Sequence, residues 1–124
     1  MEKNLSLKRG QIIWVDFQTN AGSVQGGLRP AVVVQNNIGN KHSPNTIVIP
    51  ITSSQTKANM PTHVFIPASE NILPKDSIVL CEQFFTISKK QIIKTSGILS
   101  NNLQNKIDNA ILISMGLVSV CSTK

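Results

Sequence analysis

A glycine-rich segment that leads into a predicted strand carries the residue best suited to bind a phosphate. In residues 22–30 (GSVQGGLRP), Gly26 and Gly27 permit backbone angles closed to other residues, so the chain can bend sharply and present N–H groups. Arg29 follows, and Pro30 biases it toward an extended conformation. A guanidinium fixed at the start of a strand matches the geometry of a phosphate. The segment is also compatible with a hairpin turn that carries a surface arginine.

A second polar group comes at the end of a strand predicted over residues 46–52 (TIVIPIT). If this strand pairs antiparallel with the strand that begins at Arg29, through the loop at 36–45, the start of one lies beside the end of the other. The topology then brings the Thr52 hydroxyl to the Arg29 guanidinium, with Ser53 directly after it. Threonine is common in strands, so cross-strand packing alone is the competing explanation for Thr52.

Two further groups of residues have chemical potential. Glu82 and Gln83 follow a predicted strand, where a carboxylate and an amide could orient a base or a ribose, or simply cap a helix. His42 and His63 raise a two-histidine acid–base mechanism, but nothing in their spacing brings them together.

The composition indicates one basic globular domain. The chain has 124 residues, 40% of them hydrophobic, and 12 lysines and arginines against 6 acidic residues give a net charge of +6. This balance favours RNA, DNA or an anionic membrane as partner, or serves solubility alone. Lys89, Lys90 and Lys94 either form a solvent-exposed surface or contact the phosphates of a nucleic acid.

The sequence predicts a cytoplasmic location and no metal. It shows neither a signal-peptide apolar segment nor the ~20 apolar residues of a membrane span. Cys81 is expected to be a small buried hydrophobe and Cys121 to lie in a polar tail, because neither has a Cys or His partner at metal-ligand spacing.

These residues must be positioned by a set of short strands. Turn signals and apolar alternation predict strands over 10–17, 29–35, 46–52, 62–66, 77–82 and 91–99, with a short irregular or helical connection over 84–90. Segments 36–45 and 53–61 read as loops, and Pro50 marks an edge or bulge. In the first strand, Ile13 and Val15 should face one side and Ile12 and Trp14 the other.

One helix should close the chain. It begins at Ser100 as N-cap, presents a stripe that includes Leu103, Ile107, Ala110, Ile111 and Leu117, and stops near Gly116. Leu112 and Met115 lie off this stripe and form either a dimer contact or part of a wide core face.

The predicted fold class is therefore mainly β: a small barrel or strongly curved sheet of five to six strands with a C-terminal helix. Residues 1–124 form one domain, with 119–124 as a flexible tail.

Several short sequence motifs of this chain, and the order in which they occur, resemble those of the MazF/PemK toxin family, in particular its Gram-positive branch. They are KRGQIIWVDF (8–17), GSVQGGLRPAVVVQN (22–36), GNKHSP (39–44), PIT (50–52), PTHV (61–64), KDSIVLCEQ (75–83) and DNAILISMGL (108–117).

The resemblance implies an SH3-like barrel of the CcdB/PemK type that acts as a homodimeric, metal-independent endoribonuclease. Such toxins cut single-stranded mRNA at short motifs through the ribose 2′-hydroxyl, leave a 2′,3′-cyclic phosphate and a 5′-hydroxyl, and are inhibited by a cognate antitoxin. The family's catalytic arginine and threonine map to Arg29 and Thr52. Its substrate-contacting positions map to Ser23, Gln25, Glu82 and Gln83.

This sequence departs from the family pattern at two positions near the expected groove. Val24 stands where relatives often have glutamate, and Phe85 where they often have arginine. Two other functions remain open for such a domain: a toxin of the same fold that poisons DNA gyrase without cutting RNA, and a non-catalytic RNA-binding barrel.

Overall fold

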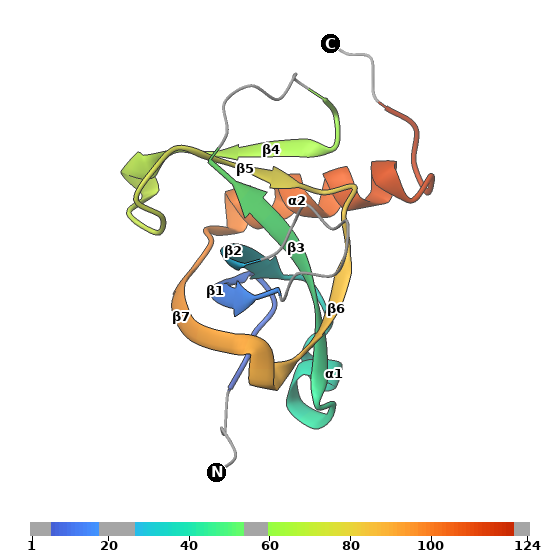
Figure 1. Ribbon diagram of the computed structural model, residues 1–124. Helices are drawn as coiled ribbons and strands as arrows, with labels where there is room; N and C mark the ends of the chain where they lie inside the picture. The colour runs from blue at the N-terminus through green and yellow to red at the C-terminus, as the bar shows by residue number, and fades with distance from the viewer. Residues whose placement is uncertain (1–5, 18–26, 54–59, 121–124) are drawn as a thin grey trace.

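Residues 6–17, 27–53 and 60–120, which the computed structural model describes, form seven antiparallel strands and two α-helices (Figure 1). The strands are β1 (Gln11–Asp16), β2 (Leu28–Val33), β3 (Asn45–Thr52), β4 (His63–Ile66), β5 (Ser77–Leu80), β6 (Phe85–Ser88) and β7 (Ile92–Ile98). The helices are α1 (Asn37–His42) and α2 (Asn101–Ser114), and two 3-10 turns are η1 (Ala68–Glu70) and η2 (Lys89–Gln91). The predicted mainly β class with a C-terminal helix is confirmed.

Strand β3 organises the sheet because it pairs with three other strands. The strand order is β4-β5-β3-β2-β1-β7, and β6 pairs with β3 outside this path. Along β3, residues 45–48 pair with β6, 48–50 with β2 and 51–52 with β5. Among the described strands the path of paired strands ends at β4 and β7. Of the two predicted forms, the structure therefore has the strongly curved sheet and not the closed barrel.

Pro50 lies where β3 changes partners. Pro50 is buried and pairs with Ala31 of β2, so the predicted edge or bulge is a local interruption of pairing on one side of an interior strand. On its other side, the ladder to β6 ends at Val48 and the ladder to β5 begins at Ile51. A residue without an N–H fits this gap between two ladders.

Two apolar clusters lie on opposite faces of β1, as the alternation predicted. Ile12 belongs to the first cluster, against which Trp14 packs, and Ile13 and Val15 belong to the second. The first cluster includes Leu103, the second includes Val48, and both contain residues of β2 and β3.

Helix α2 packs on the first cluster and confirms most of its predicted features. The Ser100 hydroxyl accepts a hydrogen bond from the Leu103 N–H at 3.2 Å, which caps the N-terminus. Leu103, Ile107 and Ala110 are buried. Leu117 is not part of the stripe, because the helix ends at Ser114 and leaves Leu117 exposed.

The face of α2 that carries Leu112 and Met115 is not core. These side chains are 38% and 52% exposed, so the wide core face was the wrong alternative.

One α-helix and one strand of the described structure were not predicted from the sequence. Helix α1 occupies part of the expected loop at 36–45, and β6 occupies part of the expected irregular or helical segment at 84–90. The Asn36 side chain caps α1 by accepting from the Gly39 N–H at 2.8 Å. Strand β6 exists because it pairs with β3, a long-range contact that local patterns do not reveal.

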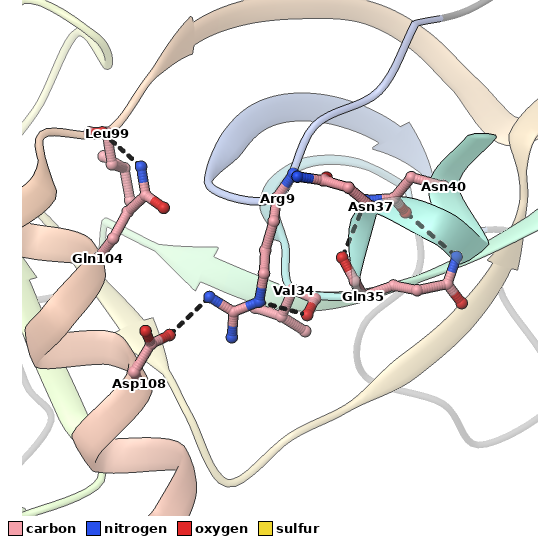
Figure 2. A network of polar contacts seen from close by, with 8 residues as sticks. All are labelled: Arg9, Val34, Gln35, Asn37, Asn40, Leu99, Gln104 and Asp108. Atoms are coloured by element: carbon pink, nitrogen blue, oxygen red, sulfur yellow. Dashed lines mark hydrogen bonds and ion pairs between the residues drawn. The ribbon is translucent and has the colours of Figure 1, made fainter.

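Arg9 connects the N-terminal segment to both helices (Figure 2). Its Nη1 donates to Asp108 of α2 at 2.7 Å, and its Nε donates to the Val34 carbonyl at 2.9 Å. Its backbone N–H donates to the Asn37 side chain of α1 at 2.8 Å. The ion pair itself is partly exposed and contributes modestly to the stability of the fold. The main structural role of Arg9 is therefore to connect separate segments of the chain.

Asn40 is the centre of a buried hydrogen-bond network between α1 and β3. Its Oδ1 accepts from Thr46 at 2.8 Å and from Gln35 at 3.1 Å, and its Nδ2 donates to the Gln35 carbonyl at 2.9 Å. The side chains of Asn40 and Thr46 are fully buried. Every bond lost here leaves a buried polar group unsatisfied.

We expect Asn40→Ala to lower the free energy of unfolding by about 3 kcal/mol, because it removes several of these bonds and leaves the Thr46 hydroxyl without its partner. Urea denaturation measures this change. Asn105→Ala is the matched control, since Asn105 is exposed on α2 and its truncation should cost less than about 0.5 kcal/mol. Equal stability of the two variants would contradict the role given to Asn40.

Candidate active site

The register of β2 and β3 brings the predicted pair Arg29 and Thr52 level with each other. Ala31 pairs with Pro50, and continuing this register by two residues along both strands places Arg29 opposite Thr52. Side chains alternate along a strand, so Arg29 shares the face of Ala31, and Thr52 the face of Val48. Because Ala31 and Val48 both belong to the second cluster, Arg29 and Thr52 lie on the same side of the sheet.

The Arg29 guanidinium is partly buried and incompletely paired. Its Nε is inaccessible to solvent and has no hydrogen-bond partner among the described residues. Buried polar atoms are nearly always paired, and an unpaired donor on a permanent cation is costly. Arg29 therefore carries a donor that the described residues leave unused, and its side chain is partly buried beside a cavity.

A cavity of about 280 Å³ adjoins Arg29 at the end of β3. Ser53 and Lys75 line it with Arg29, and so do Trp14 and Ser77. Two cationic side chains at one cavity favour an anionic occupant. Lys75 was not predicted as a site residue, although it begins the KDSIVLCEQ motif. Only the folded conformation of its loop brings Lys75 beside Arg29.

Glu82 interacts with two residues at the start of β4. One of its carboxylate oxygens accepts from the Thr62 hydroxyl at 3.1 Å, and the His63 Nε2 lies 3.3 Å from each oxygen. Burial would by itself raise the pKa of Glu82. Hydrogen bonds from its own backbone N–H, from His63 and from Thr62, together with the charge of His63, instead lower that pKa below its ordinary value of 4.5. The Glu82 side chain is held as an acceptor while remaining 37% exposed.

The structure does not bring Glu82 into the same cluster as Arg29 and Thr52. Thr52 pairs with Ile78, and Glu82 comes four residues later along the chain, roughly 13 Å further at strand spacing. A turn and β6 follow Glu82, so a helix cap was the wrong alternative for it and for Gln83. Sequence spacing gave no sign that Thr62 and His63 would hold Glu82.

Several other predictions concern single residues. Ser23 and Gln25, with the departure Val24, lie outside the described residues, as does Cys121. Phe85 contacts Phe17 edge-on with ring centroids 5.3 Å apart, and both rings pack against the second cluster.

Two of the three lysines singled out have intramolecular partners. Lys89 donates to the Asn40 carbonyl, and the Lys94 ammonium lies 5.5 Å from the centre of the Trp14 ring. Lys90 is exposed.

His42 and His63 belong to elements at opposite ends of the molecule, α1 and β4 (Figure 1). A mechanism that pairs the two histidines is therefore unsupported by the fold.

Cys81 is fully buried, as predicted, and burial together with the negative charges of Glu82 and Asp108 raises the pKa of its thiol to about 12. It is therefore an unreactive core residue.

In the described ranges, no cluster of three or more His, Cys, Asp or Glu side chains has metal-binding geometry. No helix found there is both long and apolar enough to cross a membrane.

The chain is similar to known toxins over most of its length. A profile of PemK-like, MazF-like toxins of type II toxin–antitoxin systems matches residues 8–115. The endoribonuclease MazF of Staphylococcus saprophyticus is 42% identical over 118 residues, which cover 95% of this chain and 98% of the relative. The endoribonuclease MazF of Staphylococcus epidermidis is 43% identical over 111 residues, which cover 90% of this chain and 92% of the relative.

Solved structures agree with the fold. MazF from Deinococcus radiodurans has a TM-score of 0.75 at 21% identity and covers 90% of this chain and 98% of its own. A mycobacterial endoribonuclease in complex with its cognate antitoxin has a TM-score of 0.74 at 23% identity and covers 92% of this chain and 99% of its own.

The lowered pKa of Glu82 has a testable consequence for stability. A carboxyl with a lower pKa in the folded state adds stability above its ordinary value, and this stability is lost as the pH falls through the folded-state value. We expect the unfolding free energies of the protein and of Glu82→Gln to converge as the pH falls below 4.5. Carbon NMR of the Glu82 carboxyl should give a midpoint below 4.5 that Thr62→Val raises. A midpoint at or above 4.5 in the unaltered protein would contradict the assignment.

Proposed function

This chain belongs to the PemK-like, MazF-like toxins of type II toxin–antitoxin systems, and from this premise we propose that it is a sequence-specific endoribonuclease that cuts single-stranded mRNA without a metal ion. The observation that carries the site assignment is the unpaired, buried Nε of Arg29 at a cavity beside the end of β3. A permanent cation with a free donor is suited to a phosphodiester, and the net charge of +6 favours the polyanion as a whole.

The proposed reaction is an in-line attack by the ribose 2′-oxygen on the adjacent phosphorus. A bond forms between the 2′-oxygen and phosphorus while the bond from phosphorus to the 5′-oxygen breaks. The 2′-hydroxyl loses its proton and the leaving 5′-oxygen gains one, so the products are a 2′,3′-cyclic phosphate and a 5′-hydroxyl. No oxidant, reductant or additional water is consumed.

Arg29 and Thr52 have different roles in this proposal. Negative charge builds on the phosphate oxygens in the transition state, and Arg29 stabilises it through its N–H donors. Arginine is effectively always protonated, so Arg29 acts as a charge stabiliser and not as the base, and we assign no residue as the base that takes the 2′-proton. Arg29 is also proposed to give a proton to the leaving oxygen and to regain one from solvent. Thr52 donates to the same phosphate or positions the 2′-hydroxyl. Because in-line attack needs a splayed backbone, single-stranded RNA is the expected substrate.

We propose five further substrate contacts beside this pair: Ser53, Glu82, Gln83, Ser23 and Gln25. Ser53 lines the Arg29 cavity. Glu82 and Gln83 are placed further along the chain beyond β5, where the Glu82 carboxylate is suited to accept from a base amino group rather than to bind phosphate. We assign Ser23 and Gln25 to substrate binding through their positions in the family motif.

We extend the proposal to partners and location. A mycobacterial relative was solved with its cognate antitoxin, which supports an antitoxin as partner of this chain. Leu112 on α2 and Met115 directly after it expose apolar surface, which supports a protein contact such as a homodimer. The mRNA substrate places the protein in the cytoplasm.

Substitution of the proposed catalytic pair should remove cleavage without unfolding the protein. We expect Arg29→Ala and Arg29→Lys to lower kcat by roughly a hundredfold to a thousandfold, since lysine lacks the forked donors. Thr52→Val should also lower kcat strongly. Cleavage of a long single-stranded RNA in EDTA gives the rates, and circular dichroism checks the fold.

Lys90→Ala is the matched control for charge, because it removes one exposed cation that does not line the Arg29 cavity, and it should retain activity. A 2′-deoxy substitution at the scissile nucleotide should abolish cleavage. Undiminished cleavage by Arg29→Ala would refute the mechanism, whereas RNA binding without cleavage by the unaltered protein would indicate a non-catalytic barrel.

A further inference from the structure

Phe65 is an exposed aromatic side chain on the outer face of β4. The strand alternates strictly: Val64 and Ile66 are buried in the first cluster, whereas Phe65 points to the opposite face and is 50% exposed. A phenylalanine in this position contributes little to the core, and its ring is available to a ligand.

The register connects Phe65 to the proposed reaction centre. Phe65 pairs with Ile78 of β5, and Ile78 in turn pairs with Thr52 of β3. Directly paired residues place their side chains on the same face, so these three form one row across the sheet. At about 4.8 Å between strands, Phe65 lies roughly 10 Å from Thr52.

Phe65 also borders a second cavity, of about 520 Å³, between β4 and the first turns of α2. Lys106 lines this cavity, and so do the amide side chains of Asn102 and Asn109. The other titratable groups that line it are His63, which interacts with Glu82, and Glu70 of η1. An aromatic face, a cation and amide groups are therefore gathered at one opening.

This combination is the chemistry that binds a nucleotide of single-stranded RNA. Aromatic rings stack on unpaired bases, amide side chains bond to base edges, and lysine contacts phosphate. Resting on the proposed function, we propose that Phe65 and the cavity between β4 and α2 form a base-binding subsite for a nucleotide that flanks the scissile phosphate. The row from Thr52 through Ile78 to Phe65 is the path that the RNA takes to this subsite.

The observations favour RNA over a protein as the occupant. Phe65, which lines the cavity, belongs to a cross-strand row that ends at Thr52, and the register of β2 and β3 places Arg29 opposite Thr52. Lys106 complements a phosphate, in keeping with the positive charge of the whole chain.

The test measures whether the loss of the Phe65 ring and the loss of one particular base affect RNA binding independently of each other. An oligonucleotide that the unaltered protein cleaves is made uncleavable by 2′-deoxy substitution at the scissile nucleotide, and each flanking position is replaced in turn by an abasic one. Binding is measured by fluorescence anisotropy. At one flanking position we expect the abasic replacement to weaken binding to the unaltered protein roughly tenfold, the order of one stacked base, and to have little effect on Phe65→Ala.

Further variants separate stacking from general apolar contact and from charge. Phe65→Tyr should bind like the unaltered protein, whereas Phe65→Leu should lose affinity as Phe65→Ala does. Lys106→Gln should lower the slope of log K against log salt by about 0.7, as for one phosphate contact on a single strand. Ile93→Ala is the matched control, because Ile93 is similarly exposed, at 53%, on β7 at the far end of the strand order.

The outcomes distinguish this inference from the proposed function. If the unaltered protein does not cleave RNA, the proposed function itself fails. If it does cleave, but no abasic position couples to Phe65, the subsite is refuted. A change in sedimentation of Phe65→Ala without such coupling would show that Phe65 contacts a second protein chain instead.

Discussion

The pairing of β3 with three different strands is the constraint on which the rest of this structure depends. Its first half is bonded to β6, its middle to β2 and its last two residues to β5. Pro50, which cannot donate a hydrogen bond, lies between the ladders to β6 and β5. This change of partner curves the sheet and places Thr52 at a junction, beside the start of β2 on one side and the middle of β5 on the other.

The polar interactions divide between the two ends of β3. Near its start, Asn40, Thr46 and Arg9 form satisfied networks that fasten α1 and α2 to the sheet. Beyond its end, the Arg29 Nε is buried without a partner among the described residues. Satisfied buried groups stabilise a fold, whereas an unsatisfied cationic donor costs stability and is suited to bind a ligand. The contrast follows the proposed division between a structural end and a catalytic end.

Charge placement also separates two kinds of contact with RNA. Arg29 and Lys75 meet at one cavity, where a phosphate would be stabilised. Glu82 would repel a phosphate, but its carboxylate is oriented by Thr62 and His63 and remains accessible as an acceptor. The row formed by Thr52, Ile78 and Phe65 is uncharged and ends at Phe65, which lines the cavity between β4 and α2. A strand of RNA therefore meets cations at its backbone and neutral or acceptor groups at its bases.

The sequence by itself determined most of the strands, the two faces of β1, the capped start of α2 and the pairing topology that brings Arg29 to Thr52. These features depend on local alternation, on cap residues and on a short antiparallel connection, all of which are encoded within a few neighbouring residues. Helix α1 was missed because its stability comes from buried contacts of Asn40 with other segments. Strand β6 was missed because it exists only through its pairing with β3. Only the tertiary structure decided that Thr62 and His63 hold Glu82, that Lys75 joins Arg29, and that Phe65 shares a row with Thr52. In each case the partners are far apart in the chain, and the register of a curved sheet, rather than any local pattern, sets the distance between them.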